Sequence, residues 1–192
     1  MHIKQEMIDF VINLLKNRIP GTYYYHNYEH TLYVMDKVVK IGKYENCSNN
    51  ELKLLKTAAL WHDLGYINTY KDHEEESCRL AKQSLPGYGY DTNEIDMICS
   101  MIMATKLPHT PADKLEEIIA DADMEYLGTN EAATQANNLY RELKTLNSHL
   151  TKDEWDQIEI KFLQEHRFFT SYCKQYSVPA KVRYLNNLIY GS

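Results

Sequence analysis

Apolar residues recur along the chain at intervals of three and four positions, the spacing that places them on one face of a helix. No alternation of apolar and polar residues, the pattern of a half-buried strand, competes with it. The stripes that predict helices are Ile8, Val11, Ile12 and Leu15; Val34, Met35, Val38 and Ile41; Leu54, Leu55, Ala58 and Ala59; Ile95, Ile98, Cys99, Ile102 and Met103; and Leu115, Ile118, Ile119 and Ala122. Further helical candidates follow at about 130–147, 151–172 and 180–190. We therefore expect an all-α fold.

The length and composition predict one folded unit. The 192 residues, of which 44% are hydrophobic, suffice for a core that needs neither disulfides nor a structural metal. The chain has 7 Gly and 5 Pro, and it contains no internal repeat or low-complexity linker. We expect a compact single-domain multi-helix bundle over residues 1–192. The C-terminal helices of residues 151–192 would complete this bundle. The portion from about residue 130 onward would offer a surface for a homodimer.

Charge and cysteine usage narrow the classes of partner. A net charge of −6 without a long basic run argues against binding to a nucleic acid duplex, which needs many Lys and Arg side chains at the phosphates. The four cysteines are far apart and form no Cys-x-x-Cys pair, as expected for reduced thiols in the cytoplasm. No apolar run approaches the roughly 18 residues of a membrane span. We therefore expect a cytoplasmic protein whose partner is neither a membrane nor a duplex.

A His-Asp doublet, His62 and Asp63, is the most informative local feature of the chain. The doublet by itself is a weak motif, because eight histidines and many aspartates make it frequent by chance. It stands, however, between two histidines upstream and two aspartates downstream. The full set of candidate ligands is His26, His30, His62, Asp63, Asp121 and Asp123. Such a mix of imidazoles and carboxylates binds Mn, Fe, Co, Ni or Zn and leaves coordination positions for water.

The predicted helix boundaries bring these residues toward one cleft. Asn27 is a candidate N-cap, which places His30 in the first turn of a helix and His26 just before it. Neighbouring residues on an ideal helix diverge by about 100°, so both members of the doublet can reach one metal only near a helix end. Gly65 supplies that end.

The downstream aspartates, Asp121 and Asp123, flank Ala122 of a buried stripe, and periodicity does not choose between them. Each candidate taken alone is more often a hydrogen-bonded core histidine or a helix-capping aspartate. The conjunction favours a metal site, because several helices each bring a ligand-type residue to an element boundary.

Several segments together resemble a known family. They read YHNYEH at 25–30, LWHDLG at 60–65 and ADAD at 120–123, with DHEEES at 72–77 and MATK at 103–106. The sequence resembles the HD-domain superfamily of metal-dependent phosphohydrolases, and it is most similar to bacterial predicted HD superfamily phosphohydrolases. The resemblance covers a core from about residue 22 to about residue 150.

The resemblance implies a role for each matching position. The implied ligands of a divalent metal are His30, His62, Asp63 and Asp123. Asp121 would orient Asp123 or the metal-bound water. His26 occupies the place of the histidine that protonates the leaving oxygen in cyclic-nucleotide phosphodiesterases with a Tyr-His-Asn motif. The catalytic candidates are therefore His26 and Asp63.

Other positions carry a weaker implication. His73 and His109 fall near positions that bind a second metal in dinuclear branches of the superfamily, and a surface or loop histidine is an equally good interpretation of each. Tyr66 stands where many members have a lysine that meets phosphate. The remaining candidates for a phosphate contact are Lys71, Arg79 and Lys106, each of which is as well explained as a solvated charge.

The implied activity is a metal-dependent phosphohydrolase, either a phosphomonoesterase or a phosphodiesterase. It would cleave a phosphate ester of a small molecule, with a nucleotide as one candidate, by attack of metal-bound hydroxide. The cofactor would be one ion of Mn, Fe, Ni, Co, Zn or Mg, with a second as an alternative. The alternative functions are a noncatalytic metal- or nucleotide-binding regulatory module and a di-iron oxygenase. The tyrosines at 23, 24, 25 and 28 either stack a nucleobase or cover the rim of the cleft.

Overall fold

The computed structural model describes residues 3–191, and across these residues the chain is helical and has no strand, which confirms the predicted fold class. The α-helices are α1 (Gln5–Arg18), α2 (Tyr28–Tyr44), α3 (Asn49–Trp61), α4 (His73–Ser84), α5 (Thr92–Met103), α6 (Lys114–Asp123), α7 (Ala132–Leu146), α8 (Lys152–Glu165), α9 (Ser171–Tyr176) and α10 (Val178–Tyr190). Short 3-10 helices follow three of them: η1 (Leu64–Ile67), η2 (Leu85–Tyr88) and η3 (Glu125–Gly128).

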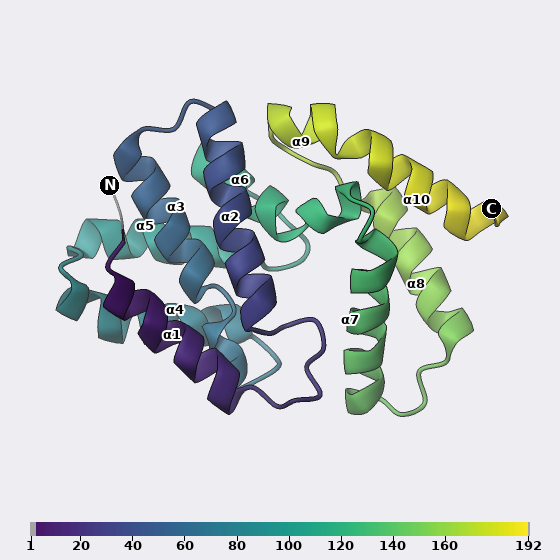
Figure 1. Cartoon of the computed structure of the whole chain (residues 1–192), viewed down its shortest axis with the longest axis horizontal. Helices are drawn as coiled ribbons and strands as arrows, with labels where there is room; N and C mark the ends of the chain where they lie inside the picture. The colour runs from purple at the N-terminus through teal and green to yellow at the C-terminus, as the bar shows by residue number, and fades with distance from the viewer. Residues whose placement is uncertain (1–2, 192) are drawn as a thin grey trace.

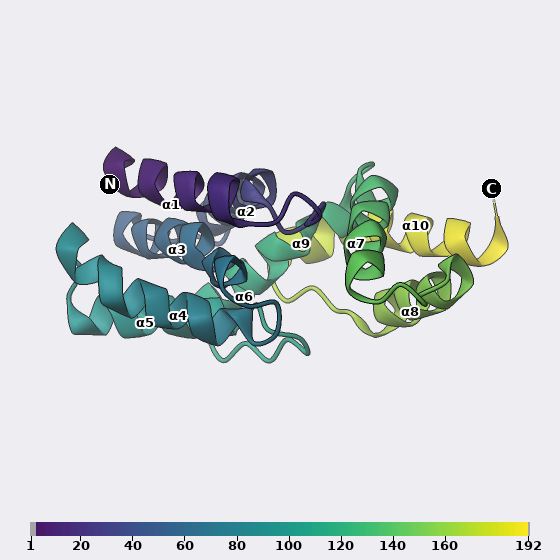
Figure 2. The ribbon, with the colours of Figure 1, turned by 90° about the horizontal axis from the view of Figure 1, so that it is seen from below.

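The helices form two groups (Figure 1). Helices α1 to α6 lie at one end of an elongated molecule, and α7, α8 and α10 lie at the other, with the two chain termini at opposite ends. The view from below shows the same separation (Figure 2). The segment around η3 leads from α6 into α7 and so connects the groups.

The predicted apolar stripes form the core of the first group. The stripes of α2, α3 and α6 are fully or almost fully buried, and Ile95, Ile98, Cys99 and Ile102 of α5 join them. Local signals fix where these helices begin. The side chain of Asn27 accepts the backbone N–H groups of Glu29 and His30, which confirms Asn27 as the N-cap of α2. Ser48 and Asp91 begin α3 and α5 with capping boxes.

Two elements differ from the sequence-based expectation. Helix α4 has no apolar stripe, because its buried face consists of Glu74, Ser77, Cys78 and Ala81, so periodicity does not reveal it. The helical candidate at 151–172 is two helices, since α8 ends at Glu165 and α9 begins at Ser171. Between them the side chain of Thr170 caps α9 by accepting the N–H of Cys173.

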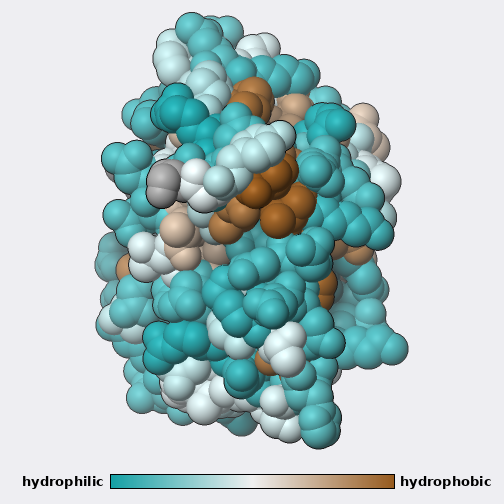
Figure 3. Space-filling model, turned by 90° about the vertical axis from the view of Figure 1, so that its right-hand side faces the viewer, coloured by the Kyte–Doolittle hydropathy of each residue, from teal (hydrophilic) through white to brown (hydrophobic). Residues whose placement is uncertain are grey.

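Some of the exposed side chains on the surface are apolar. No helix within residues 3–191 is long and apolar enough to cross a membrane. Figure 3 looks onto the end of the molecule formed by the C-terminal helices, where a hydrophobic patch is surrounded by hydrophilic side chains. Exposed apolar residues of α8 and α10 include Ile158, Val182 and Ile189. A homodimer through this surface stays a prediction.

Candidate metal centre

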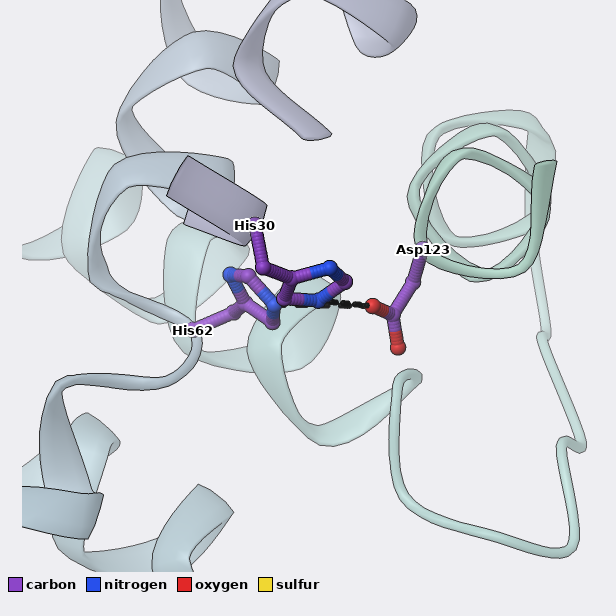
Figure 4. A group of neighbouring side chains, drawn as sticks. All are labelled: His30, His62 and Asp123. Atoms are coloured by element: carbon purple, nitrogen blue, oxygen red, sulfur yellow. Dashed lines mark hydrogen bonds and ion pairs between the residues drawn. The ribbon is translucent and has the colours of Figure 1, made fainter. Parts of the chain in front are cut away.

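Three candidate ligands from three different helices meet at one point (Figure 4). His30 lies in the first turn of α2, His62 directly follows α3, and Asp123 is the last residue of α6. One ligand atom from each lies within 4.8 Å of the other two. His30 Nε2 is 2.9 Å from Asp123 Oδ1, and His62 Nε2 is 3.6 Å from the same oxygen. The fold thus gathers two imidazoles and a carboxylate that are far apart in the sequence.

Asp63 adds a second carboxylate to this cluster. Its Oδ2 atom is 3.2 Å from His62 Nε2 and 3.5 Å from His30 Nε2. Both His62 Nε2 and Asp63 Oδ2 are buried and have no hydrogen-bond partner among the described residues. A buried polar atom without a partner destabilises the fold, and a divalent cation would satisfy both atoms at once. The residues present therefore fit a metal ion.

The backbone orients the His62 ring for this role. His62 Nδ1 is 2.8 Å from the carbonyl oxygen of Ala59. A carbonyl only accepts, so Nδ1 carries the proton of this bond and Nε2 is the atom that remains for a metal. The end of α3 makes this orientation of the ring accessible, because the helix stops at Trp61 and His62 and Asp63 lie in the turn before η1.

Electrostatics keep both carboxylates ionised. Burial opposes their charge, but neighbouring histidines outweigh it: His62 lowers the pKa of Asp63 well below its usual value, and His30 does the same for Asp123. Burial likewise opposes a proton on the His62 ring, yet Asp63 and Asp123 raise its pKa well above the ordinary value. A bound metal would displace that proton, as metals do at histidine ligands.

His26 lies beside this cluster and is held by a residue that the sequence did not reveal, Glu142 of α7. Glu142 Oε1 is 2.5 Å from His26 Nδ1 and accepts the hydroxyl of Tyr70 at 3.2 Å. Its Oε2 accepts the backbone N–H groups of Tyr25 and His26 at 2.9 and 3.0 Å. Burial lowers the pKa of His26, but the bond to Glu142 and the charge of Asp63 outweigh it, so the pKa lies above its ordinary value.

No sequence signal points to Glu142. It stands between Arg141 and Leu143 on a helix that also carries polar and charged residues, and a glutamate at such a position is expected to face solvent. In the structure its side chain is completely buried. The pairing joins positions 116 residues apart, and only the packing of α7 against the loop before α2 creates it.

Tyr66 of η1 packs between two histidines. Its ring stacks on His73 with centroids 3.8 Å apart and lies 4.4 Å from the centroid of His26. Tyr23 and Tyr70 meet it edge-on. Tyr66 thus restricts the positions of two imidazoles.

Tyr23, Tyr24 and Tyr25 precede α2, and Tyr28 is its first residue. Of these four tyrosines, Tyr25 is buried against His30 and Tyr126 and is the one that lines the cavity described below. Tyr24 lies under the guanidinium of Arg141, and Tyr28 lies under the amino group of Lys16. These contacts favour the covering role over the stacking of a nucleobase.

A cavity of about 540 Å³ opens beside the cluster and is lined by His26, Asp63, His73 and Asp123 among others. Two of the three candidate phosphate contacts line it, Lys71 and Lys106. Lys106 pairs with two acidic residues of the α4 region, whereas Lys71 has no ion pair with any described residue. Arg79 lies outside the cavity and pairs with Glu76 on the surface of α4.

The two candidate ligands of a second metal, His73 and His109, lie in different places. His73 Nε2 lies 3.5 Å from Asp63 Oδ1, on the side of that carboxylate away from His62. His109 is 3.2 Å from the carbonyl of Thr105 and lines a separate cavity together with His166. The structure therefore brings His73, but not His109, beside the cluster.

The role expected for Asp121 needs correction. Its carboxylate does not turn to Asp123; it accepts the N–H of Phe169 at 2.9 Å and both the N–H and the hydroxyl of Thr170 at 2.8 and 2.6 Å. Residues two positions apart on a helix point in different directions, so Asp121 and Asp123 of α6 contact different parts of the structure. Asp121 anchors the segment between α8 and α9 to α6.

Comparisons with known proteins agree with this geometry. The family model described as HD domain matches residues 27–125, more than half of the chain, including the ligand cluster. The crystal structure of a predicted HD superfamily hydrolase from an uncultured Thermotogales bacterium shares the fold, with a TM-score of 0.55 and 22% sequence identity. The superposition covers 81% of this chain and 88% of the other. A search of curated proteins gives no significant match. The match of the family model, which includes the candidate ligands that converge in space, shows that the chain belongs to the HD-domain family.

Proposed function

We propose that this protein is a metal-dependent phosphohydrolase that acts on a phosphate ester of a small molecule. The observation that carries the proposal is the cluster of His30, His62 and Asp123 with Asp63 beside it, which has two unpartnered ligand atoms and lies at the wall of a cavity. His26 also lines this cavity, where it would serve as a proton donor. A regulatory module would not need such a group, so His26 supports the enzyme over the module.

The four residues of the cluster would hold one divalent ion. Bound there, the ion would lower the pKa of a coordinated water and offset negative charge on the phosphoryl oxygens. The chain's own contribution is to fix the ligand atoms. Ala59 sets the tautomer of His62, and the helix ends of α2, α3 and α6 fix where the rings and carboxylates lie.

His26 would donate a proton to the leaving oxygen of the ester. Glu142 holds the ring through Nδ1, so Nε2 is the nitrogen available toward the substrate. The bond to Glu142 and the charge of Asp63 raise the pKa of His26, which favours the protonated ring that a general acid requires. Tyr66 stacks against the same ring and limits its rotation.

The phosphate would be met by Lys71, whose side chain is the cavity-lining cation without a described ion pair. Lys106 already has two acidic partners, Asp72 and Glu75, and so offers less net attraction to an anion. We expect Lys71→Ala to raise KM more than it lowers kcat, because a surface lysine contributes mainly to binding.

The test is phosphate release together with metal content. Protein purified without chelator is assayed on 4-nitrophenyl phosphate and its metal is measured by elemental analysis. We expect close to one ion per chain and an activity that a chelator removes and the metal restores. Asp63→Ala should lose both metal and activity, whereas Asp96→Ala, an exposed aspartate of α5, should keep both. Metal binding without turnover of any ester would instead indicate a binding module.

The role of His26 has a separate test. An alkoxide leaves poorly without a proton, whereas nitrophenolate needs little help, so His26→Ala should reduce the hydrolysis of an alkyl phosphate more than that of 4-nitrophenyl phosphate. The difference should reach about 10²–10⁴ in rate, the usual contribution of a general acid. Equal losses on the two esters would exclude proton donation by His26.

A further inference from the structure

The large cavity has two chemically different ends. The end beside the ligand cluster is polar and comes from the loop before α2, from η1 and from the start of α4. The opposite end comes mainly from α7 and α8 and is apolar. Its lining includes Leu107, Leu139, Leu143, Trp155, Ile158 and Phe162. One continuous cavity therefore joins the proposed reaction centre to a hydrocarbon-like wall.

The apolar wall is open to solvent. Leu107 and Ile158 are each 52% exposed, and Leu139, Leu143 and Phe162 are half-buried. Apolar side chains that line a cavity next to a reaction centre gain free energy when a ligand removes them from water. The apolar wall is continuous with the proposed site. The part of the substrate that extends from the phosphate would therefore lie against this wall.

Few polar side chains that could recognise a sugar or a base line this end of the cavity. Among the residues that the structure describes, no Asn, Gln, Ser or Arg lines the cavity. Glu159 is the acidic residue of the apolar end, and its carboxylate already accepts the hydroxyl of Tyr184. A ribose or hexose bound here would give up hydrogen bonds to water without replacement, which disfavours its binding.

We infer that the substrate is a phosphate ester of an apolar alcohol, with an alkyl or aryl group on the wall of α7 and α8. This inference rests on the proposed function and specifies its substrate class. It replaces the nucleotide that the sequence suggested as one candidate. The phosphate lies at the polar end near Lys71, and the carbon skeleton extends toward Trp155 and Phe162.

The experiment compares kcat/KM for butyl, hexyl and octyl phosphate, 1-naphthyl phosphate, glucose 6-phosphate and AMP, using the metal-loaded protein. Each methylene that leaves water contributes about fourfold to kcat/KM. We expect kcat/KM to rise by about this factor per added methylene until the wall is covered. The alkyl and naphthyl esters should exceed glucose 6-phosphate and AMP by at least about tenfold.

Two variants of α8 test where the alkyl chain lies. Ile158→Asn places an amide on the wall and should reduce the octyl-to-butyl ratio of kcat/KM by about tenfold. Ile160→Asn is the matched control, because Ile160 is on the same helix and does not line the cavity. It should leave the ratio unchanged.

The outcomes separate the two levels of the proposal. A flat alkyl series, or glucose 6-phosphate or AMP hydrolysed as well as octyl phosphate, would overturn the apolar substrate and leave the phosphohydrolase in place. An unchanged octyl-to-butyl ratio in Ile158→Asn would overturn the assignment of the wall. No hydrolysis of any ester by the metal-loaded protein would overturn the proposed function itself, and the substrate class with it.

Discussion

Replacing Glu142 by glutamine tests how the C-terminal helices contribute to the proposed reaction. The two backbone N–H groups at Tyr25 and His26 can only donate, and they lie 2.9 and 3.0 Å from Oε2. In Glu142→Gln the amide oxygen must therefore stay on that side, and the NH₂ group faces His26 Nδ1 and the Tyr70 hydroxyl. The protonated His26 ring then loses its acceptor, while the volume of the side chain stays the same.

The expected size follows from the bond that is lost. A hydrogen bond to a charged group contributes about 1.5–3 kcal/mol, which corresponds to about 10- to 100-fold in kcat when the charged ring acts in the rate-limiting step. The variant also loses the interaction that raises the pKa of His26. A general acid with a lower pKa gives up its proton at lower pH, so the alkaline limb of the kcat profile should move toward lower pH.

The assay is the pH profile of kcat on an alkyl phosphate, with metal content and thermal unfolding measured alongside. Glu45→Gln is the matched control, because Glu45 also accepts a backbone N–H, that of Tyr172 at 2.8 Å, and does not line the cavity. The control should keep both kcat and the alkaline limb. If folded, metal-loaded Glu142→Gln has the kcat and the alkaline limb of the unchanged protein, Glu142 does not position a proton donor.

Three further predictions concern stability. Asp121→Asn should lower the free energy of unfolding by about 2 kcal/mol in urea titrations, because it replaces the charged acceptor of Thr170 by a neutral one. The variant should keep its metal, and loss of metal would mean that Asp121 belongs to the site. Burial and the charge of Arg167 lower the pKa of Lys181 to about 8. Between about pH 8 and the ordinary pKa of lysine, the unfolded chain binds more protons at this position than the folded chain does. The free energy of unfolding of the unchanged protein, measured relative to Lys181→Met, should therefore rise with pH in this window. A difference that does not depend on pH would contradict the lowered pKa. Gly65→Ala would put a Cβ atom 2.0 Å from the carbonyl oxygen of His73. We therefore expect the free energy of unfolding to fall by about 1–3 kcal/mol in the same urea titrations. An unchanged free energy of unfolding would show that α4 can shift to make room for the methyl group.

Much of the first helix group follows from local rules. Each stripe from α2, α3, α5 and α6 needs a partner surface, and each capping residue fixes a helix start within a few positions. For this reason the sequence predicted Asn27 as a cap and located His30 in the first turn of α2. The same rules miss α4, whose charged residues leave no apolar stripe, and the break between α8 and α9, which depends on a contact with α6.

The choice between Asp121 and Asp123 shows the limit of local reasoning. Both flank the same buried alanine, and both side chains are buried in the structure. What separates them is the neighbour that each carboxylate meets: the imidazoles of His30 and His62 for Asp123, and the segment of Phe169 and Thr170 for Asp121. Helix periodicity gives the direction of a side chain but does not name what lies there.

By itself, the sequence determined the helical class, the positions of several helices and the residue types of the candidate ligands, because capping, periodicity and ligand chemistry act through nearby residues. The tertiary structure alone decided that Glu142 holds His26, that Tyr66 lies between two imidazoles and that an apolar wall faces the ligand cluster. The contact of Glu142 with His26 and the apolar wall arise where the C-terminal helices meet the first helix group, whereas the stack of Tyr66 forms within the first group. Both arise from tertiary packing, which no local pattern encodes.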